Sequence, residues 1–169
     1  GGLWQSDGTA AGTMLVKAVS GGSIVKAGNS LFFVYGDATT GMELWKSDGT
    51  SAGTLMVKDV TPGSGSTSFG AFTSMGGSLF FNVDGFGLWK TDGTAAGTSM
   101  VADLNGTANS AYPTYLVATS NYLYYKANHP GYGQELWRTD GSAEGTTMVV
   151  DLSPGATSTL IDQMVPAGN

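Results

Sequence analysis

The sequence has no cysteine, a single histidine and a single arginine, and only 12% of its 169 residues are charged. Without cysteine, neither a disulfide framework nor thiolate chemistry is available. One histidine cannot build a metal site of paired histidines, and a cysteine–histidine dyad is excluded as well. Arg138 is the only arginine that could accompany converging acids in a hydrolase or lyase site. We therefore predict that the protein has no catalytic residues and is not an enzyme.

Long apolar runs and basic patches are also missing. No apolar stretch approaches the roughly 18 residues of a membrane helix, and no signal-peptide pattern precedes Gly1. The formal net charge is −6, and the seven lysines and arginines are scattered along the chain. This distribution disfavours nucleic acid, whose phosphates need clustered basic side chains, and it disfavours an anionic lipid surface.

Glycine is abundant, with 27 residues, and the 41% hydrophobic fraction is enough to bury a core. Because glycine follows no triplet period, frequent tight turns explain it better than collagen does. One phrase occurs four times: Leu-Trp, two residues, Asp-Gly, Thr or Ser, two residues, Gly-Thr. Its tryptophans, Trp4, Trp45, Trp89 and Trp137, lie 41, 44 and 48 residues apart. This period is typical of repeat architectures, in which a unit needs neighbours to bury its apolar faces.

Four short apolar segments recur in each repeat and are predicted as strands. The first strands are expected at Ser23–Ala27, Phe69–Met75, Tyr115–Thr119 and Leu160–Val165, and the second at Leu31–Val34, Leu79–Val83 and Tyr122–Tyr125. The Leu-Trp segment is the third strand, and the fourth strands are expected at Met14–Val16, Leu55–Val57, Met100–Val101 and Met148–Val150. Short turns join the first two strands at Gly28-Asn29, Gly76-Gly77, Ser120-Asn121 and Gly168-Asn169.

Consecutive apolar residues within a strand indicate that both faces of each sheet are covered. We therefore predict an all-β fold, a β-propeller of four-stranded antiparallel blades that forms part of a larger or multi-chain ring. A β-sandwich is the alternative, but it gives no reason for one tryptophan and one Asp-Gly turn per repeat. The expected boundaries are a partial blade over 1–20, blades over 21–60, 61–104 and 105–152, and the first strand of a further blade within 153–169.

The repeated phrase resembles the bacterial ELWxxDGT repeat. The copies from Glu43 to Thr50 and from Glu135 to Gly141 fit it closely, whereas Gly2 and Gly87 replace the glutamate in the other two. The resemblance covers essentially the whole chain. It implies a propeller-type protein that is secreted or anchored at the bacterial surface, with no assigned catalytic residues.

The predicted strands leave one blade incomplete, because a Leu-Phe-Phe strand is missing between Asn169 and Gly1. Three interpretations are open. The chain is a window from a longer repeat protein, several chains share a ring or fibre, or another segment donates the strand by β-augmentation. The expected partners are therefore further repeats or other copies of the same protein.

The aspartates of the four turns are the sharpest candidates for a bound ion, because they recur in register: Asp7, Asp48, Asp92 and Asp140. An aspartate that accepts backbone N–H bonds and stabilises its turn is the simpler interpretation. Calcium is the possible cofactor, although it needs 6–8 oxygens and each turn offers one carboxylate. For the four tryptophans, we predict a structural role in filling the gap between adjacent blades rather than sugar stacking.

Ligand binding is expected where the copies differ, because loops on a rigid scaffold carry recognition. The second-to-third and fourth-to-first connections vary and should share one rim, opposite the uniform Asp-Gly turns. The candidate ligand-binding residues there are Asp37, Asp84, Phe86, His129 and Tyr132. His129, beside proline in a glycine-rich loop, is most simply a solvated residue. We predict a non-enzymatic extracellular structural or adhesion module, with a lectin-like propeller that binds surface glycans at repeated sites as the alternative.

Overall fold

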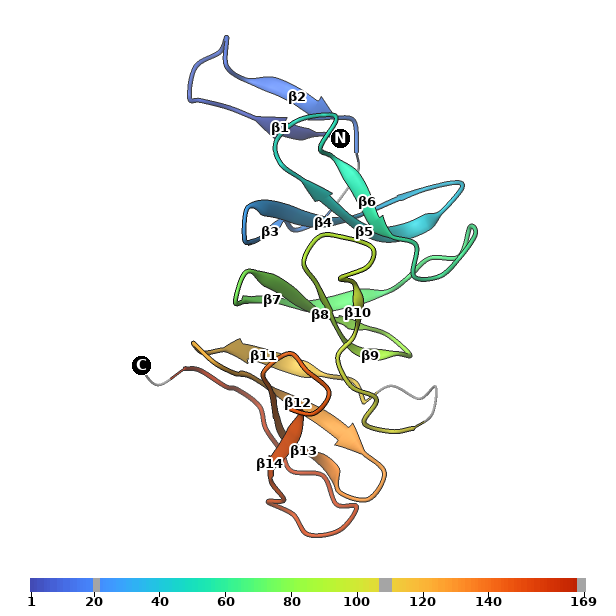
Figure 1. The fold of residues 1–169 in the computed structure, drawn as a ribbon, viewed down its shortest axis with the longest axis vertical. Coiled ribbons are helices and arrows are strands. Elements are labelled where there is room, and N and C mark those ends of the chain that lie inside the picture. Colours follow the sequence, from blue (N-terminus) through green and yellow to red (C-terminus); the bar gives the residue numbers. More distant parts are fainter. Residues whose placement is uncertain (20–21, 107–110, 167–169) are drawn as a thin grey trace.

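Four antiparallel β-sheets follow one another along the long axis of the molecule in the computed structural model (Figure 1). The structure describes residues 1–19, 22–106 and 111–166. Within these ranges there are fourteen strands and no helix. No helix of the described residues is therefore long and apolar enough to cross a membrane.

The strands group into units that follow the sequence repeat. Unit 1 holds two strands, β1 (Leu3–Gln5) and β2 (Met14–Lys17). Unit 2 holds β3 (Val25–Ala27), β4 (Ser30–Asp37), β5 (Gly41–Ser47) and β6 (Leu55–Lys58). Unit 3 holds β7 (Phe69–Met75), β8 (Ser78–Val83), β9 (Gly87–Thr91) and β10 (Ser99–Met100). Unit 4 holds β11 (Thr114–Ala118), β12 (Leu123–His129), β13 (Gly133–Thr139) and β14 (Thr147–Val150).

Each sheet is a meander in which strands that are consecutive in sequence are hydrogen-bonded neighbours. The third strand lies between the second and the fourth, so that Trp45 is opposite Phe33 on β4 and Met56 on β6. The equivalent Trp137 is opposite Tyr125 and Met148. Such cross-strand pairs of large apolar side chains stabilise a sheet.

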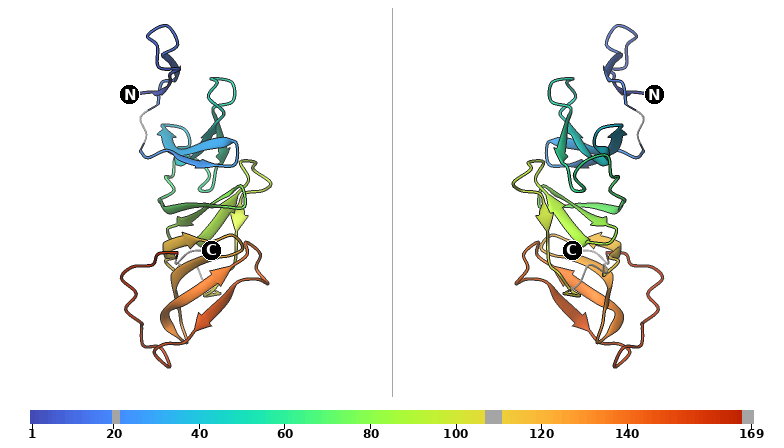
Figure 2. Two further views of the ribbon diagram at one scale, coloured as in Figure 1. Left: turned by 90° about the vertical axis from the view of Figure 1, so that its left-hand side faces the viewer. Right: turned by 90° about the vertical axis from the view of Figure 1, so that its right-hand side faces the viewer.

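The sheets pack face to face, as Figure 2 shows from two sides. Phe32, Leu44 and Val57 of unit 2 share one buried cluster with Leu79 and Phe81 of unit 3, among others. A second cluster joins units 3 and 4; its members include Phe80, Leu88, Val101, Leu123, Tyr125 and Trp137. Both faces of the middle sheets are therefore buried, as the consecutive apolar residues predicted.

Two of the turns between first and second strands use glycine. Gly28 has a φ of 54° and Gly76 a φ of 58°, a region that a residue with a Cβ enters only at a cost. The predicted turns at Gly28-Asn29, Gly76-Gly77 and Ser120-Asn121 all lie between the first and second strands of their units. The predicted turn at Gly168-Asn169 lies outside the described residues.

The strand predicted at Leu160–Val165 is wrong, because residues 151–166 form no strand. After β14 the chain turns back along unit 4 and ends beside β11 (Figure 1). Leu160 is 88% exposed, and Lys126 Nζ donates to the carbonyl oxygen of Ile161 at 3.3 Å. A first strand is hydrogen-bonded to the second strand of its own sheet, and this segment meets no such strand among the described residues.

Trp45, Trp89 and Trp137 lie in the contacts between sheets, whereas Trp4 does not, and the structural role of the rings stays a prediction. Trp137 is 7% exposed, and Trp45 and Trp89 are half-buried against the preceding unit. Trp4 is 59% exposed. The reason is its place in the stack: each ring faces the preceding unit, and unit 1 is the first of the described sheets.

Candidate functional site

The Asp-Gly-Thr turn between third and fourth strands is a closed hydrogen-bond network. In unit 2, Asp48 Oδ1 accepts bonds from the Thr50 backbone N–H at 2.8 Å and from its hydroxyl at 2.7 Å. Thr50 Oγ1 in turn accepts the Gly53 N–H at 2.9 Å. The Thr54 hydroxyl donates to the Thr50 carbonyl at 2.6 Å and lies 2.7 Å from Ser47 Oγ. The recurring aspartate and both threonines of the turn are thus bonded to one another or to the backbone of the turn.

The two glycines of the phrase recur for two different structural reasons. Gly49 has a φ of 94°, in the left-handed region that glycine tolerates. Gly53 lies so close to Asp48 that a Cβ there would overlap with the carboxylate. The same overlap arises for the glycine of Gly-Thr in every unit, which explains why both glycines recur.

The four turn aspartates are exposed, and hydrogen bonds lower their pKa values. The Thr50 hydroxyl and backbone N–H hold the pKa of Asp48 below its usual value of 3.8. Equivalent bonds act on Asp7, Asp92 and Asp140. This geometry is the turn-stabilising aspartate that the sequence predicted. No group of three or more histidines, cysteines or acids that could hold a metal occurs among the described residues; calcium binding stays a prediction.

In units 2 and 3, the lysine after the tryptophan reaches the turn of the next unit. Lys90 Nζ donates to the carbonyl oxygen of Gly141 at 2.6 Å, and Lys46 lies against Gly93. The positive charge of Lys46 also lowers the pKa of both Asp48 and Asp92. Ionic and hydrogen-bonded contacts thus recur between neighbouring sheets. Sequence reasoning missed them, although Lys46 and Lys90 occupy the same position of the repeat.

A second lysine, at the end of the fourth strand, also crosses to the next unit. Lys58 Nζ donates to the Thr98 carbonyl oxygen at 2.9 Å and lies 5.7 Å from the centre of the Trp89 ring. Lys17 makes the equivalent contact, 5.1 Å from the centre of the Trp45 ring. A cation over an indole face is attracted by the ring quadrupole. These tryptophan faces are therefore occupied from within the molecule.

The glutamates of the phrase are buried, and each binds the segment that follows the fourth strand of its own unit. Glu43 accepts bonds from the Val60 and Thr61 N–H groups at 3.1 and 3.3 Å and from the Thr67 hydroxyl at 2.6 Å. Glu135 repeats this with the Leu152 N–H and the Thr159 hydroxyl, again 24 residues onward.

The two glutamates lie in units 2 and 4, with unit 3 between them. In unit 3 the matching positions hold Gly87 and the buried Ala111. These two positions hold a polar pair, glutamate and threonine, in units 2 and 4, and an apolar pair in unit 3. The glutamates therefore stabilise the fold and do not face each other as a pair of acids.

The variable connections lie on one rim, as predicted. The Ser68 hydroxyl, in the connection to β7, donates to Asp84 Oδ2 at 2.8 Å, and the Asp84 N–H donates to the Ser68 carbonyl oxygen at 3.0 Å. Asp84 Oδ1 also accepts the Asn82 amide at 3.1 Å. Asp37 caps its own loop, and the Thr40 and Thr39 N–H groups lower its pKa. These two aspartates are engaged in loop structure.

The aromatic candidates lie in two different hairpins, β8–β9 and β12–β13. Phe86 is exposed at the tip of the β8–β9 hairpin. His129 and Tyr132 come together in unit 4, with ring centres 4.9 Å apart, and His129 also stacks on Trp137 at 5.8 Å. The Gly131 N–H donates to His129 Nδ1 at 3.1 Å. His129 is thus half-buried in an aromatic stack rather than solvated. The structure therefore does not bring the five candidate residues together in one site; His129 contacts Tyr132, and the others lie in separate connections.

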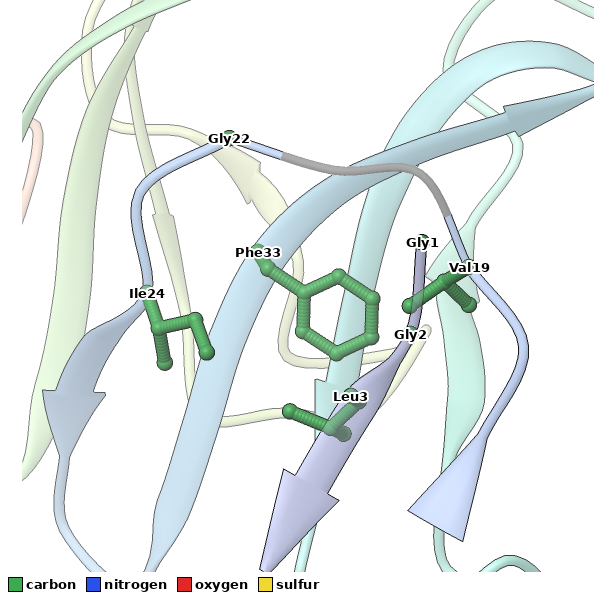
Figure 3. A pocket seen from close by; sticks show the side chains of 7 residues that line it. All are labelled: Gly1, Gly2, Leu3, Val19, Gly22, Ile24 and Phe33. Atoms are coloured by element: carbon green, nitrogen blue, oxygen red, sulfur yellow. The ribbon is translucent and has the colours of Figure 1, made fainter. Parts of the chain in front are cut away.

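A hollow of about 410 Å³ opens beside the free edge of β1 (Figure 3). The side chains of Leu3, Val19, Ile24 and Phe33 converge on it, and Gly22 lies at its border. A second hollow, of about 470 Å³, lies at the other end of the molecule, between unit 4 and the segment of residues 163–166. One hollow thus lies at unit 1 and the other at unit 4, the first and last of the described sheets.

No known protein family matches this chain, and no curated protein matches it. Among solved structures, it is similar to a mutant of puromycin hydrolase in complex with PGG, with a TM-score of 0.48, 12% identity and 78% of this chain covered. It is also similar to the computationally designed protein Ika8, with a TM-score of 0.46, 12% identity and 85% covered. The chain spans about 22% of the first of these proteins and about 41% of the second.

Proposed function

We propose that the protein is a non-enzymatic extracellular module of the ELWxxDGT type, a structural or adhesive segment of a β-propeller that associates with further repeats or copies. One observation carries this proposal. The recurring polar residues are engaged in holding a turn or joining two sheets, while the recurring apolar residues fill the contacts between sheets. Each repeat therefore forms a sheet whose two faces are suited to pack against neighbouring sheets.

Among the described residues, the two end sheets have a neighbouring sheet on one side only, and their contact residues are placed differently. In unit 1, Trp4 and Leu15 are opposite each other and exposed, where the inner units pair a covered tryptophan with a methionine. In unit 4, Arg138 has the position of Lys46 and Lys90, but its guanidinium lies 4.6 Å from the centre of the Tyr122 ring of its own sheet. One end therefore carries an uncovered indole, and at the other end the cation in the position of Lys46 and Lys90 contacts a tyrosine of its own unit.

Sedimentation velocity over a range of concentrations tests the proposal. We expect the wild-type chain to associate as concentration rises and the Trp4→Ser variant to associate less. Phe86→Ser is the matched control, because Phe86 is an exposed aromatic residue on the rim rather than on an end sheet. A wild-type chain that stays monomeric at all concentrations, or equal effects of both variants, would contradict the proposal.

The second candidate function is carbohydrate recognition at the variable rim. The observation that favours it is the aromatic pair of His129 and the exposed Tyr132, since exposed rings are suited to stack against apolar faces of sugars. A glycan array tests it: we expect Tyr132→Ala to remove any signal that the wild type shows, and an array without signal would reject this function.

A further inference from the structure

A polar hollow of about 290 Å³ lies between units 3 and 4, on the rim that carries the Asp-Gly turns. Its lining comes from the first-to-second turn of each unit, from the Asp-Gly turn of unit 4, and from β8 and β9. Both units are four-stranded sheets, so the hollow belongs to an inner contact of the stack.

The contact between units 2 and 3 shows how the hollow arises. There the two first-to-second turns touch, because a Cβ on Gly28 would lie 2.9 Å from the Gly77 carbonyl oxygen. In unit 3 the position of Gly28 is taken by Gly76, and a Cβ on Gly76 would meet no atom within 4 Å. The facing turn of unit 4 is Ser120-Asn121 instead of a glycine pair. The turns of units 3 and 4 therefore stand apart, and the hollow lies between them.

Polar groups around the hollow are available to a ligand. Three side chains of the lining have no hydrogen bond to another described residue: Ser78, Ser120 and Asn121. Lys90 Nζ donates one proton to the Gly141 carbonyl oxygen at 2.6 Å, and an ammonium group has two more. Asp140 accepts both bonds from Ser142 with Oδ1, which leaves Oδ2 as an acceptor. Donors and acceptors thus surround one small volume.

The charges and the size of the hollow narrow the class of ligand. Lys90 and Asp140 have opposite charges, so the lining has no excess charge that would select an anion or a cation. A hydroxyl group both donates and accepts, so it can bind an ammonium group, a carboxylate or an amide. Met75 and Phe80 add apolar surface for C–H groups. Pockets for drug-sized ligands measure roughly 300–1,000 Å³, so a smaller molecule fits here.

We propose that this hollow binds one neutral sugar residue, whose hydroxyl groups bond to the side chains of Lys90, Asp140 and Asn121. The inference goes beyond the proposed function, because it places a binding site on the rim of the uniform turns, between two sheets. This site is also separate from the pair of His129 and Tyr132, which lies on the variable rim. With few contacts, the expected dissociation constant is in the millimolar range.

NMR titration of the full chain with methyl glucoside, methyl galactoside and methyl mannoside tests the inference. At least one of these sugars should shift the amide signals of residues 76–78, 120–121 and 140–141 with the saturation of a single site. Signals of residues 84–86 and 130–132, on the variable rim, should stay unchanged. Inorganic phosphate at the same concentration should shift none of these signals, because Asp140 repels an anion.

Two variants place the sugar in the hollow. Asn121→Ala removes one hydrogen-bonding side chain and should weaken binding about fivefold. Ser120 is exposed and has no positive φ, so Ser120→Phe should leave the fold intact while its ring fills the hollow and abolishes binding. The matched control is Ser64→Phe, at an exposed serine of the β6–β7 connection, and it should leave binding unchanged.

The outcomes separate this inference from the proposed function. Sugar binding that is lost in Ser120→Phe and kept in Ser64→Phe supports the site, whether or not the chain self-associates. Binding that is lost in Tyr132→Ala but kept in Ser120→Phe places the sugar on the variable rim and overturns the inference. A chain that self-associates but shows no shifts with any of the three sugars, or that binds phosphate in the hollow, overturns it as well and leaves the proposed function standing.

Discussion

Removing the buried carboxylate of Glu43 gives the sharpest prediction about stability. In Glu43→Ala, the Thr67 hydroxyl and the N–H groups of Val60 and Thr61 lose their acceptor. A buried donor without a partner costs about 1–3 kcal/mol. Thr67 is fully buried and the other two residues are half-buried, so we take values near the lower end for the N–H groups. The free energy of unfolding should fall by about 3–5 kcal/mol.

A double-mutant cycle tests the reasoning behind this value. Thr67→Ala alone removes one donor to the carboxylate, and the hydroxyl-to-carboxylate bond of 2.6 Å should contribute a coupling energy of about 1.5–3 kcal/mol. The double variant resembles unit 3, where Gly87 and the buried Ala111 take these positions. Urea unfolding followed by circular dichroism measures all four chains. A loss below about 1 kcal/mol in Glu43→Ala, or strictly additive effects, would refute the reasoning.

Three further predictions concern the stack and its turns. Trp137→Ala should lower the free energy of unfolding by about 3–5 kcal/mol, because the Trp137 ring is buried. Trp4→Ala in the monomer should change it by less than about 1 kcal/mol, because the Trp4 ring is exposed. Gly53→Ala should lower the melting temperature, because the new Cβ displaces the Asp48 carboxylate from its turn. Acid should weaken the turns: their aspartates have lowered folded pKa values, so their contribution is complete above about pH 4 and is lost as pH falls through those values.

Each of these predictions has its own control. The two tryptophan variants are controls for each other, and equal losses would contradict the stacking order. For the turn, Gly70→Ala adds a Cβ into open space at a residue without a positive φ, so a similar drop in melting temperature would show that Gly53 has no special role. Asp48→Asn keeps an acceptor oxygen without a titrating group. Its stability should vary less between pH 2 and 5 than that of the wild type, and an unchanged pH profile would contradict the assignment.

The sheets could be predicted from the sequence because each repeat contains the same short apolar segments between the same turn residues. Phe69–Met75 was predicted as a strand with the bounds that β7 has. The roles of Asp48 and Gly49 followed from turn chemistry that acts within a few residues. Such local interactions leave a clear pattern in one sequence, and four copies make it stronger.

The rest depends on neighbours that the pattern does not show. Trp4 follows Gly-Leu just as Trp89 does, yet it is exposed because no preceding sheet among the described residues covers it. The bond from Glu43 to Thr67 spans 24 residues, and the stack of His129 on Trp137 depends on how a loop folds back over its own sheet. The segment from Leu160 to Val165 has the composition of a strand, but no described strand pairs with it. These features become visible only when the sheets are placed in space.

Hydrogen exchange at two protein concentrations tests the central claim most directly, namely that each sheet is stabilised by the sheets on either side. Among the described residues, unit 1 has such a neighbour on one side only. In the dilute chain, amides of β1 and β2 should exchange fastest, while those of β8 and β12 exchange slowest at either concentration. At high concentration the exchange of β1 and β2 should slow. Exchange of β1 and β2 that is as slow as that of β8 when dilute, and independent of concentration, would contradict the account.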